Sequence, residues 1–149
     1  MVVQTFSKSR SLAGARLGFA IANEEIIKDL EKIKYSTNPY SINRLSLLAG
    51  TAAVESDSYY MDNCKKIIKT REYTTAELIK LGFKVLPSSA NFIFAKKDGL
   101  NGEEIYKNLR KNGILVRHFT KDKIKDYNRI TIGTQKEMEK FIIVISSII

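Results

Sequence analysis

The stretch TFSKSRSLAGARLGFAIAN, residues 5–23, sets a lysine, Lys8, and an arginine, Arg16, eight positions apart in a run of small residues. The apolar runs on either side, VVQTF at 2–6 and LGFAIA at 17–22, both have the length of a β-strand. The second run lacks alternation, which predicts a fully buried strand. Lys8 is therefore expected after a strand end, among small and apolar groups that disfavour its charged form and make its amine a nucleophile toward an aldehyde.

Groups that suit a phosphate accompany this lysine. Arg16 offers a planar fork of donors, and Thr5 and Ser7 carry hydroxyl groups beside the same point. A nucleophilic amine next to groups that clamp a phosphate is the set that pyridoxal 5'-phosphate (PLP) requires. The residue pattern therefore indicates PLP as the cofactor.

The segment SKSRSLAGARLGFAIA resembles the lysine signature of the class I/II PLP-dependent aminotransferases, in particular the histidinol-phosphate aminotransferase-like branch. The resemblance implies that Lys8 is the catalytic residue and holds the cofactor as a Schiff base. It also implies that Arg16 and Ser7 bind the phosphate of the cofactor. Thr5 is a weaker match to a cofactor-binding position.

Two later stretches extend the resemblance to the substrate. NRITIGT, residues 128–134, is similar to the family's arginine-bearing strand, which implies that Arg129 binds the α-carboxylate of the amino-acid substrate. ILVRHF, residues 114–119, is similar to the preceding strand, which implies that Arg117 binds a substrate phosphate. Two further stretches support membership of the same family: SSANFIF at 88–94 and NPYSIN at 38–43.

The apolar spacing predicts strands and helices along the whole chain. Asn23 is expected to cap a helix, and helical spacing returns at 42–52 and at 59–81, where Gly82 ends it. After Gly82 the order β-β-α-β-β-α predicts an α+β lobe with helices on one side of a mostly antiparallel sheet. The predicted elements of this lobe are FKVLP, NFIFAKK, a helix capped by Asn101, ILVRHF, NRITIG, and a last helix with a capping box formed by Thr134 and Glu137.

The resemblance implies a fold class that combines α/β and α+β parts. We expect the C-terminal part of a fold type I PLP-dependent transferase, with residues 1–57 as the C-terminal piece of the large PLP-binding domain. Residues 58–149 are then the small C-terminal α+β domain. The resemblance covers only the family's C-terminal portion, so the chain is expected to be a fragment that is inactive by itself.

For the intact protein the resemblance implies a cytoplasmic homodimer that transfers an amino group between an amino acid, or histidinol phosphate, and a 2-oxo acid. A PLP-dependent decarboxylase of a phosphorylated amino acid is an alternative, because it shares the lysine and the carboxylate-binding arginine. Two alternatives belong to other classes: a basic nucleic-acid-binding domain and a non-catalytic interaction domain. Substrate profiling and salt-dependent binding of nucleic acid would separate these classes.

Composition and charge narrow the classes of partner and site that the chain can have. The formal net charge of +9 favours anionic ligands, but the lysines alternate with acidic residues and form no basic stripe, so we expect no nucleic-acid partner. Cys64 is the only cysteine, which excludes an internal disulfide, and His118 is the only histidine, so no metal site is expected. The most apolar run, residues 141–149, is too short to span a membrane, so no membrane partner is expected.

Overall fold

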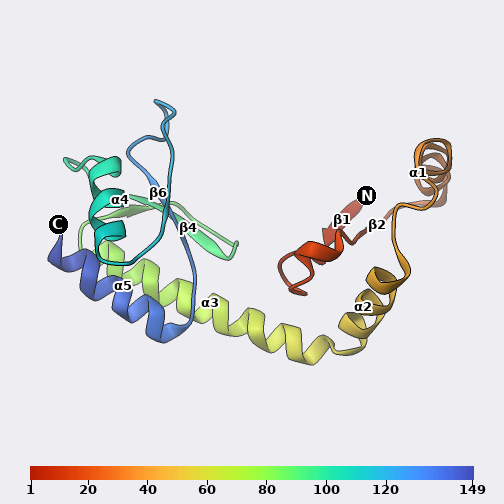
Figure 1. Cartoon of the computed structure of the whole chain (residues 1–149), viewed down its shortest axis with the longest axis horizontal. Coiled ribbons are helices and arrows are strands. Elements are labelled where there is room, and N and C mark those ends of the chain that lie inside the picture. Colours follow the sequence, from red (N-terminus) through yellow and green to blue (C-terminus); the bar gives the residue numbers. More distant parts are fainter. The chain divides into compact units, whose positions relative to one another are not determined.

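The computed structural model describes residues 1–149 as two compact units, unit 1 (Met1–Cys64) and unit 2 (Lys65–Ile149). Figure 1 labels the elements of both. Each unit has its own group of buried apolar side chains. The domain boundary expected after residue 57 concerns the large and small domains of an intact enzyme and stays a prediction.

Unit 1 begins with an antiparallel hairpin of β1 (Val2–Thr5) and β2 (Gly18–Ile21), which confirms both predicted strands. The expectation that the second strand is fully buried is wrong. Its Phe19 and Ile21 are exposed because no further strand or helix of this unit covers the hairpin on both faces. An apolar run without alternation is therefore not buried in this chain but forms exposed apolar surface.

Two helices complete unit 1: α1 (Glu24–Thr37) and α2 (Arg44–Glu55). The side chain of Asn23 accepts a hydrogen bond from the Ile26 N–H at 3.2 Å, so the predicted cap is confirmed. Asn43 caps α2 in the same way. No residue of α1 is buried, and its apolar side chains therefore lie at the surface of the unit.

The core of unit 2 is larger and is built on a four-stranded antiparallel sheet in the order β3-β4-β6-β5. The elements are α3 (Asp57–Lys80, which begins before the unit boundary), β3 (Lys84–Val85), β4 (Phe92–Lys96), α4 (Gly102–Lys111), β5 (Arg117–His118), β6 (Asn128–Thr131) and α5 (Gln135–Ser147). This confirms the predicted α+β lobe. The predicted capping box at the start of α5 is present in full.

Alternation along β4 and β6 decides which side of the sheet is covered. Ile93 and Ile130 are opposite each other in the register and are at most 3% exposed. They pack with buried side chains of the three helices of the unit, so all helices lie on one face of the sheet (Figure 1). The helix-facing cluster also contains Leu78, Phe83, Ala95, Ile105, Leu109, Ile132, Met138, Phe141 and Ile145.

β5 is shorter than the predicted strand at 114–119. The Ile114 N–H donates to the Leu109 carbonyl at 2.9 Å, and Gly113 between them has φ +75°, which is the geometry of a glycine-terminated helix C-terminus. These bonds hold Ile114 at the end of α4, so only Arg117 and His118 reach the ladder with β6. None of the helices combines the length and the apolar content that crossing a bilayer requires.

Leu78 and Ile79 on α3 offer a matched test of this core, because Leu78 is fully buried and Ile79 is 56% exposed. We expect Leu78→Ala to lower the free energy of unfolding by about 2–5 kcal/mol, through lost burial and the cavity left behind. Ile79→Ala should change it by about 0.5 kcal/mol or less. Urea unfolding followed by circular dichroism measures both, and equal effects of the two variants would contradict the packing described.

Candidate functional site

The lysine of the opening motif lies in a loop, residues 7–16, that joins the two strands of the hairpin. The Phe6 N–H donates to the Leu17 carbonyl at 3.0 Å, and the Leu12 N–H donates to the Phe6 carbonyl at 3.0 Å. These bonds close the loop at its base and fold its first half back onto the strand end. Lys8 and the arginine of the motif therefore belong to one closed loop, as the strand-lysine-strand pattern predicts.

The polar groups of the loop remain accessible. Lys8 is exposed and its amine has no hydrogen-bond or ion-pair partner, so the expectation that its neighbours bury it is wrong for this chain. Ser7 is half-buried, and its backbone N–H donates to Thr5 Oγ1 at 3.3 Å. Arg16 is exposed and uses Nη1 to donate to the Ala13 carbonyl at 3.2 Å, which leaves its other N–H groups for an anion.

Two residues of the loop adopt a left-handed backbone conformation. Ser11 has φ 55° and Arg16 has φ 53°, and Arg16 directly follows a short 3₁₀ turn, Ala13–Ala15. Non-glycine residues in this region cost of order 1–3 kcal/mol and persist where surrounding contacts enforce them, often at functional sites. The conformation of Arg16 is therefore a feature that the loop's contacts maintain.

Small side chains of α2 supply part of those contacts. Ser46 is buried, and its hydroxyl donates to the Ala15 carbonyl at 3.0 Å. At Gly50 a Cβ atom would lie 2.3 Å from Leu17 Cδ2, so glycine at this position lets Leu17 pack against the helix. Leu17 and Ala53 belong to the buried cluster of the unit. The loop is therefore seated on a stripe of small residues.

Arg10 anchors the other side of the loop, two positions after Lys8. Its guanidinium donates to the Ala53 carbonyl at 3.4 Å and forms an ion pair with Asp57 at 2.5 Å. It also lies 5.5 Å from the centre of the Tyr60 ring, and its side chain is only 18% exposed. The turn that carries Lys8 is thus tied to α2 and to the start of α3.

Sequence reasoning missed Arg10, Ser46 and Gly50. Ser46, Gly50 and Ala53 are small residues at helical spacing, a signal that could have indicated close approach of another segment to this helix. Arg10 carries no such signal, because Ala53 and Asp57 are 43 and 47 positions away in the sequence. Its role as an anchor depends on the fold.

The donor set of the loop fits PLP. A free primary amine at Lys8 suits an aldehyde carbon, and the remaining N–H groups of Arg16 suit a phosphate. The hydroxyl groups of Ser7 and Thr5 lie on the strand end that leads into the same loop. The residues present therefore match both reactive ends of the cofactor.

The second group of predicted site residues lies on the sheet face of unit 2 that the helices do not cover. We call it the open face. Its residues point to the same side of the sheet as Arg129, as the strand register shows, and they are Lys84, Phe92, Phe94, Lys96, Arg117, Arg129 and Thr131. Arg117 and Arg129 are direct register partners on β5 and β6. The structure therefore brings the two predicted substrate-binding arginines together, with side chains on the same face.

One aromatic ring lies beside each arginine. Arg117 Cζ lies 5.7 Å from the centre of the Phe119 ring, and Arg129 Cζ lies 5.3 Å from the centre of the Phe92 ring. The Nε atom of Arg129 is buried without a hydrogen-bond partner. Because a buried guanidinium N–H favours an acceptor, Arg129 is suited to bind an anionic group.

The two lysines of this face, Lys84 and Lys96, share one acidic partner, Asp98. Lys96 forms an ion pair with Asp98 at 3.0 Å, and the hydrogen bond that Lys96 donates to Asp98 raises the pKa of Lys96 above its usual value. Lys84 and Lys96 together lower the pKa of Asp98. Arg117 and Arg129 have no acidic partner among the ion pairs of the structure, so an external anion meets them without competition from a carboxylate.

His118 lies on the opposite side of the same ladder. It is the register partner of Asn128 and stacks on Tyr106 of α4, with ring centres 5.9 Å apart. Asn128 is buried, and its side-chain amide donates to the Gly102 carbonyl at 2.9 Å. This position supports its interpretation as a strand residue that alternates with Arg117.

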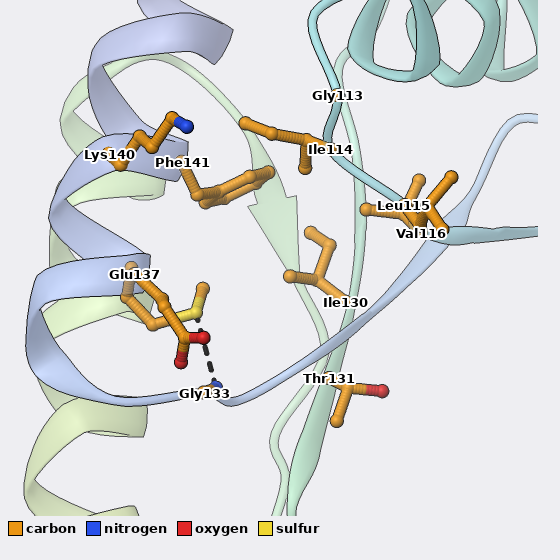
Figure 2. Close-up of a pocket in the computed structure, with 11 residues that line it drawn as sticks. Gly113, Ile114, Leu115, Val116, Ile130, Thr131, Gly133, Glu137, Lys140 and Phe141 are labelled. Atoms are coloured by element: carbon orange, nitrogen blue, oxygen red, sulfur yellow. Dashed lines mark hydrogen bonds between the residues drawn. The ribbon is translucent and has the colours of Figure 1, made fainter.

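Two hollows of the structure lie beside these elements. A cavity of about 380 Å³ lies between α5, the end of β6 and residues 113–116, with mainly apolar walls (Figure 2). At its edge the Gly133 N–H donates to Met138 Sδ at 3.4 Å. A second hollow, of about 540 Å³, lies beside Leu17 and α2 in unit 1. Neither hollow is lined by Lys8, Arg16, Arg117 or Arg129, although Thr131 of the open face lines the first.

The chain thus combines a lysine loop between two strands with an α+β lobe that carries two arginines as register partners. The model of the family "Aminotransferase class I and II" matches residues 1–145. The chain belongs to the class I and II aminotransferase family.

Individual relatives agree. The histidinol-phosphate aminotransferase of Brachyspira hyodysenteriae is 54% identical over 142 residues, which are 95% of this chain and 40% of that protein. The structure of the Clostridium acetobutylicum histidinol-phosphate aminotransferase matches 97% of this chain and 44% of its own, with TM-score 0.82 and 27% identity. The Sinorhizobium meliloti enzyme, solved in complex with PLP, matches 99% of this chain and 41% of its own, with TM-score 0.78 and 26% identity.

The chain spans about two fifths of the length of the curated relatives it matches. These structural neighbours confirm the expected fold class, part of a fold type I PLP-dependent transferase. The family expectation drawn from the SKSRSLAGARLGFAIA segment is confirmed as well.

The anchor at Arg10 yields a test of the loop. We expect Arg10→Ala to speed amide hydrogen exchange of residues 7–12 by about fivefold, because an ion pair of this partial exposure contributes up to about 1 kcal/mol to local stability. Arg44→Ala, which removes an exposed arginine at the start of α2, should leave that exchange unchanged. Equal exchange rates in Arg10→Ala and the parent chain would show that Arg10 does not hold the loop.

Proposed function

We propose that this chain supplies the cofactor lysine and the substrate-binding arginines of a PLP-dependent aminotransferase. The observation that carries the proposal is the closed loop 7–16, in which Lys8 and Arg16 both keep free donors on a segment matched by the family model. The similarity to histidinol-phosphate aminotransferases supports amino transfer between an amino acid, or histidinol phosphate, and a 2-oxo acid. PLP is the cofactor in this proposal.

Four residues of unit 1 would hold the cofactor. Lys8 would bind it covalently at its aldehyde carbon, and Arg16, Ser7 and Thr5 would bind its phosphate through charge-assisted and hydroxyl hydrogen bonds. When bound, PLP supplies an aldehyde that exchanges amines and a ring that withdraws electrons from the substrate. Lys8 would also hold and move a proton at the substrate Cα.

Two residues of unit 2 would bind the substrate. Arg129 would hold the α-carboxylate with a bidentate pair of N–H groups, for which its partnerless Nε is suited. Arg117 would bind a second anion, which in a histidinol phosphate-like substrate is the phosphate. A substrate held at its anionic ends has its amine oriented and loses little further entropy in the reaction.

The same proposal implies the domain arrangement and the activity of the intact enzyme. Residues 1–57 would complete the large PLP-binding domain, and residues 58–149 would form the small domain of a homodimeric enzyme. The chain by itself would be inactive. A decarboxylase of a phosphorylated amino acid would use the same lysine and carboxylate arginine, and release of carbon dioxide in place of a 2-oxo acid would identify it.

A chimaera tests the proposal. This chain replaces the matching 40% of the Brachyspira hyodysenteriae enzyme, and transfer of the amino group to a 2-oxo acid is measured. Lys8→Ala should lower kcat by about 10²–10⁴-fold or more, because it removes the acid-base group and the covalent anchor. Lys136→Ala, a change of an exposed lysine on α5, should leave turnover unchanged.

A second measurement keeps the test decisive if the chimaera fails to fold. The 149-residue chain is incubated with PLP and cyanoborohydride, and the modified lysine is located by mass spectrometry. We expect labelling at Lys8 in preference to Lys136 and the other exposed lysines. Uniform labelling of the exposed lysines would refute the role of Lys8, and so would near-normal turnover of a folded Lys8→Ala chimaera.

A further inference from the structure

We infer that Phe119 and Phe92 are positioning residues that hold Arg117 and Arg129 as two separate anion subsites on the open face. The inference rests on the proposed function, because it concerns how the two arginines are presented to a substrate. It adds residues to which neither the sequence motifs nor the proposed mechanism gives a role. The partner in each subsite is an anionic group of carboxylate or phosphate type.

The strand register places two positive charges close together, and a separate aromatic ring lies beside each of them. Arg117 and Arg129 are directly opposite on neighbouring antiparallel strands, where Cβ atoms are about 4.5–5.5 Å apart and like charges repel. Neither guanidinium pairs with a carboxylate. Each lies over a different ring instead, Arg117 over Phe119 and Arg129 over Phe92. Attraction to separate π faces draws the two charges apart and gives each a fixed resting place.

The rings themselves are held in place. Phe119 makes an edge-to-face contact with Phe94, with ring centres 5.8 Å apart, and Phe94 stacks on Tyr127 at 4.7 Å. Phe92 is fixed through its backbone, whose carbonyl accepts a hydrogen bond from the Ser88 hydroxyl at 2.6 Å. The two supports are therefore distinct: Phe119 depends on the aromatic cluster, and Phe92 depends on the start of β4.

A cation–π contact uses one face of a guanidinium and leaves the donors at its edge without a partner. A ring occupies one face of the planar group, while the N–H donors lie along its edge and stay available for oxygen atoms. A rigidly supported arginine also loses less conformational freedom when an anion binds. Removing a ring should therefore weaken anion binding at the arginine it supports and leave the other arginine unchanged.

The test follows the Nε–Hε signals of Arg117 and Arg129 by ¹H–¹⁵N NMR while inorganic phosphate is added to the 149-residue chain. In the parent chain both signals should shift, each with its own Kd. Phe119→Leu should raise the Kd at Arg117 by about two- to fivefold, the factor that corresponds to an exposed cation–π contact. The Kd at Arg129 should stay within error.

The matched variant reverses the pattern. Phe92→Leu should raise the Kd at Arg129 by a similar factor and leave Arg117 unchanged, while Phe119→Tyr, which keeps the ring, should behave as the parent. Backbone amide spectra confirm that each variant is folded. A loss of equal size at both arginines in Phe119→Leu would indicate general loosening of the sheet and would overturn the inference, as would no change at either.

Failure of this inference and failure of the proposed function are separable. If phosphate shifts both arginine signals but the leucine variants do not alter them, the positioning role is wrong and the proposed function stands. If phosphate shifts neither signal in the parent chain, the anion subsites and the substrate-binding roles fail together. If the subsites behave as expected but Lys8 is neither labelled nor needed for turnover, the proposed function alone fails.

Discussion

The alternation of side chains along β4 and β6 is the constraint on which unit 2 depends. Residues of one parity, such as Ile93 and Ile130, are buried against three helices, which commits the other parity to the open face. Arg129 is on that face because Ile130 is in the core. A shift of one residue in the register would bury the arginine and expose the core. The burial that stabilises the sheet therefore also fixes the face on which Arg129 lies.

In unit 1 an irregular loop is held in place although most of its residues are exposed. The loop 7–16 has no ladder of its own. Part of its polar backbone is satisfied by bonds within the loop, by the Phe6 carbonyl and by the Ser46 hydroxyl, while the Arg10 side chain ties the loop to the Ala53 carbonyl of α2. Small residues on α2 bring the helix close enough for these bonds. The left-handed conformation of Arg16 is maintained by this seating, so Ser46 and Gly50 act on the cofactor-binding candidates from the helix beneath them.

Much of this arrangement is predictable from the sequence because local rules decide it. The caps at Asn23 and Thr134 and the glycine stop after α3 each depend on a few neighbouring residues, and the structure confirms them. The alternation that defines β4 is local as well. The motif around Lys8 predicts a loop between strands, and the pairing of β1 with β2 agrees with it.

The remainder depends on contacts between distant segments. The exposure of β2 was not predictable, because an apolar run has the same composition whether or not another element covers it in this chain. β5 is short because the Ile114 N–H bonds to the Leu109 carbonyl at the end of α4, and this contact cannot be read from either segment alone. Arg10 and Asp57 meet only in the folded chain, and so do the rings over which the two arginines lie.

The two groups of candidate residues differ in what their surroundings provide. The loop places Lys8 and Arg16 on one closed segment and leaves both open to solvent, whereas the open face gives Arg129 a buried Nε and an aromatic support. An exposed cation binds an anion weakly, because water competes for the same donors and screens the charge. We therefore expect anions to bind more tightly at Arg129 than at the loop. The contribution of the loop is geometric, because it presents an amine and a guanidinium from one closed loop.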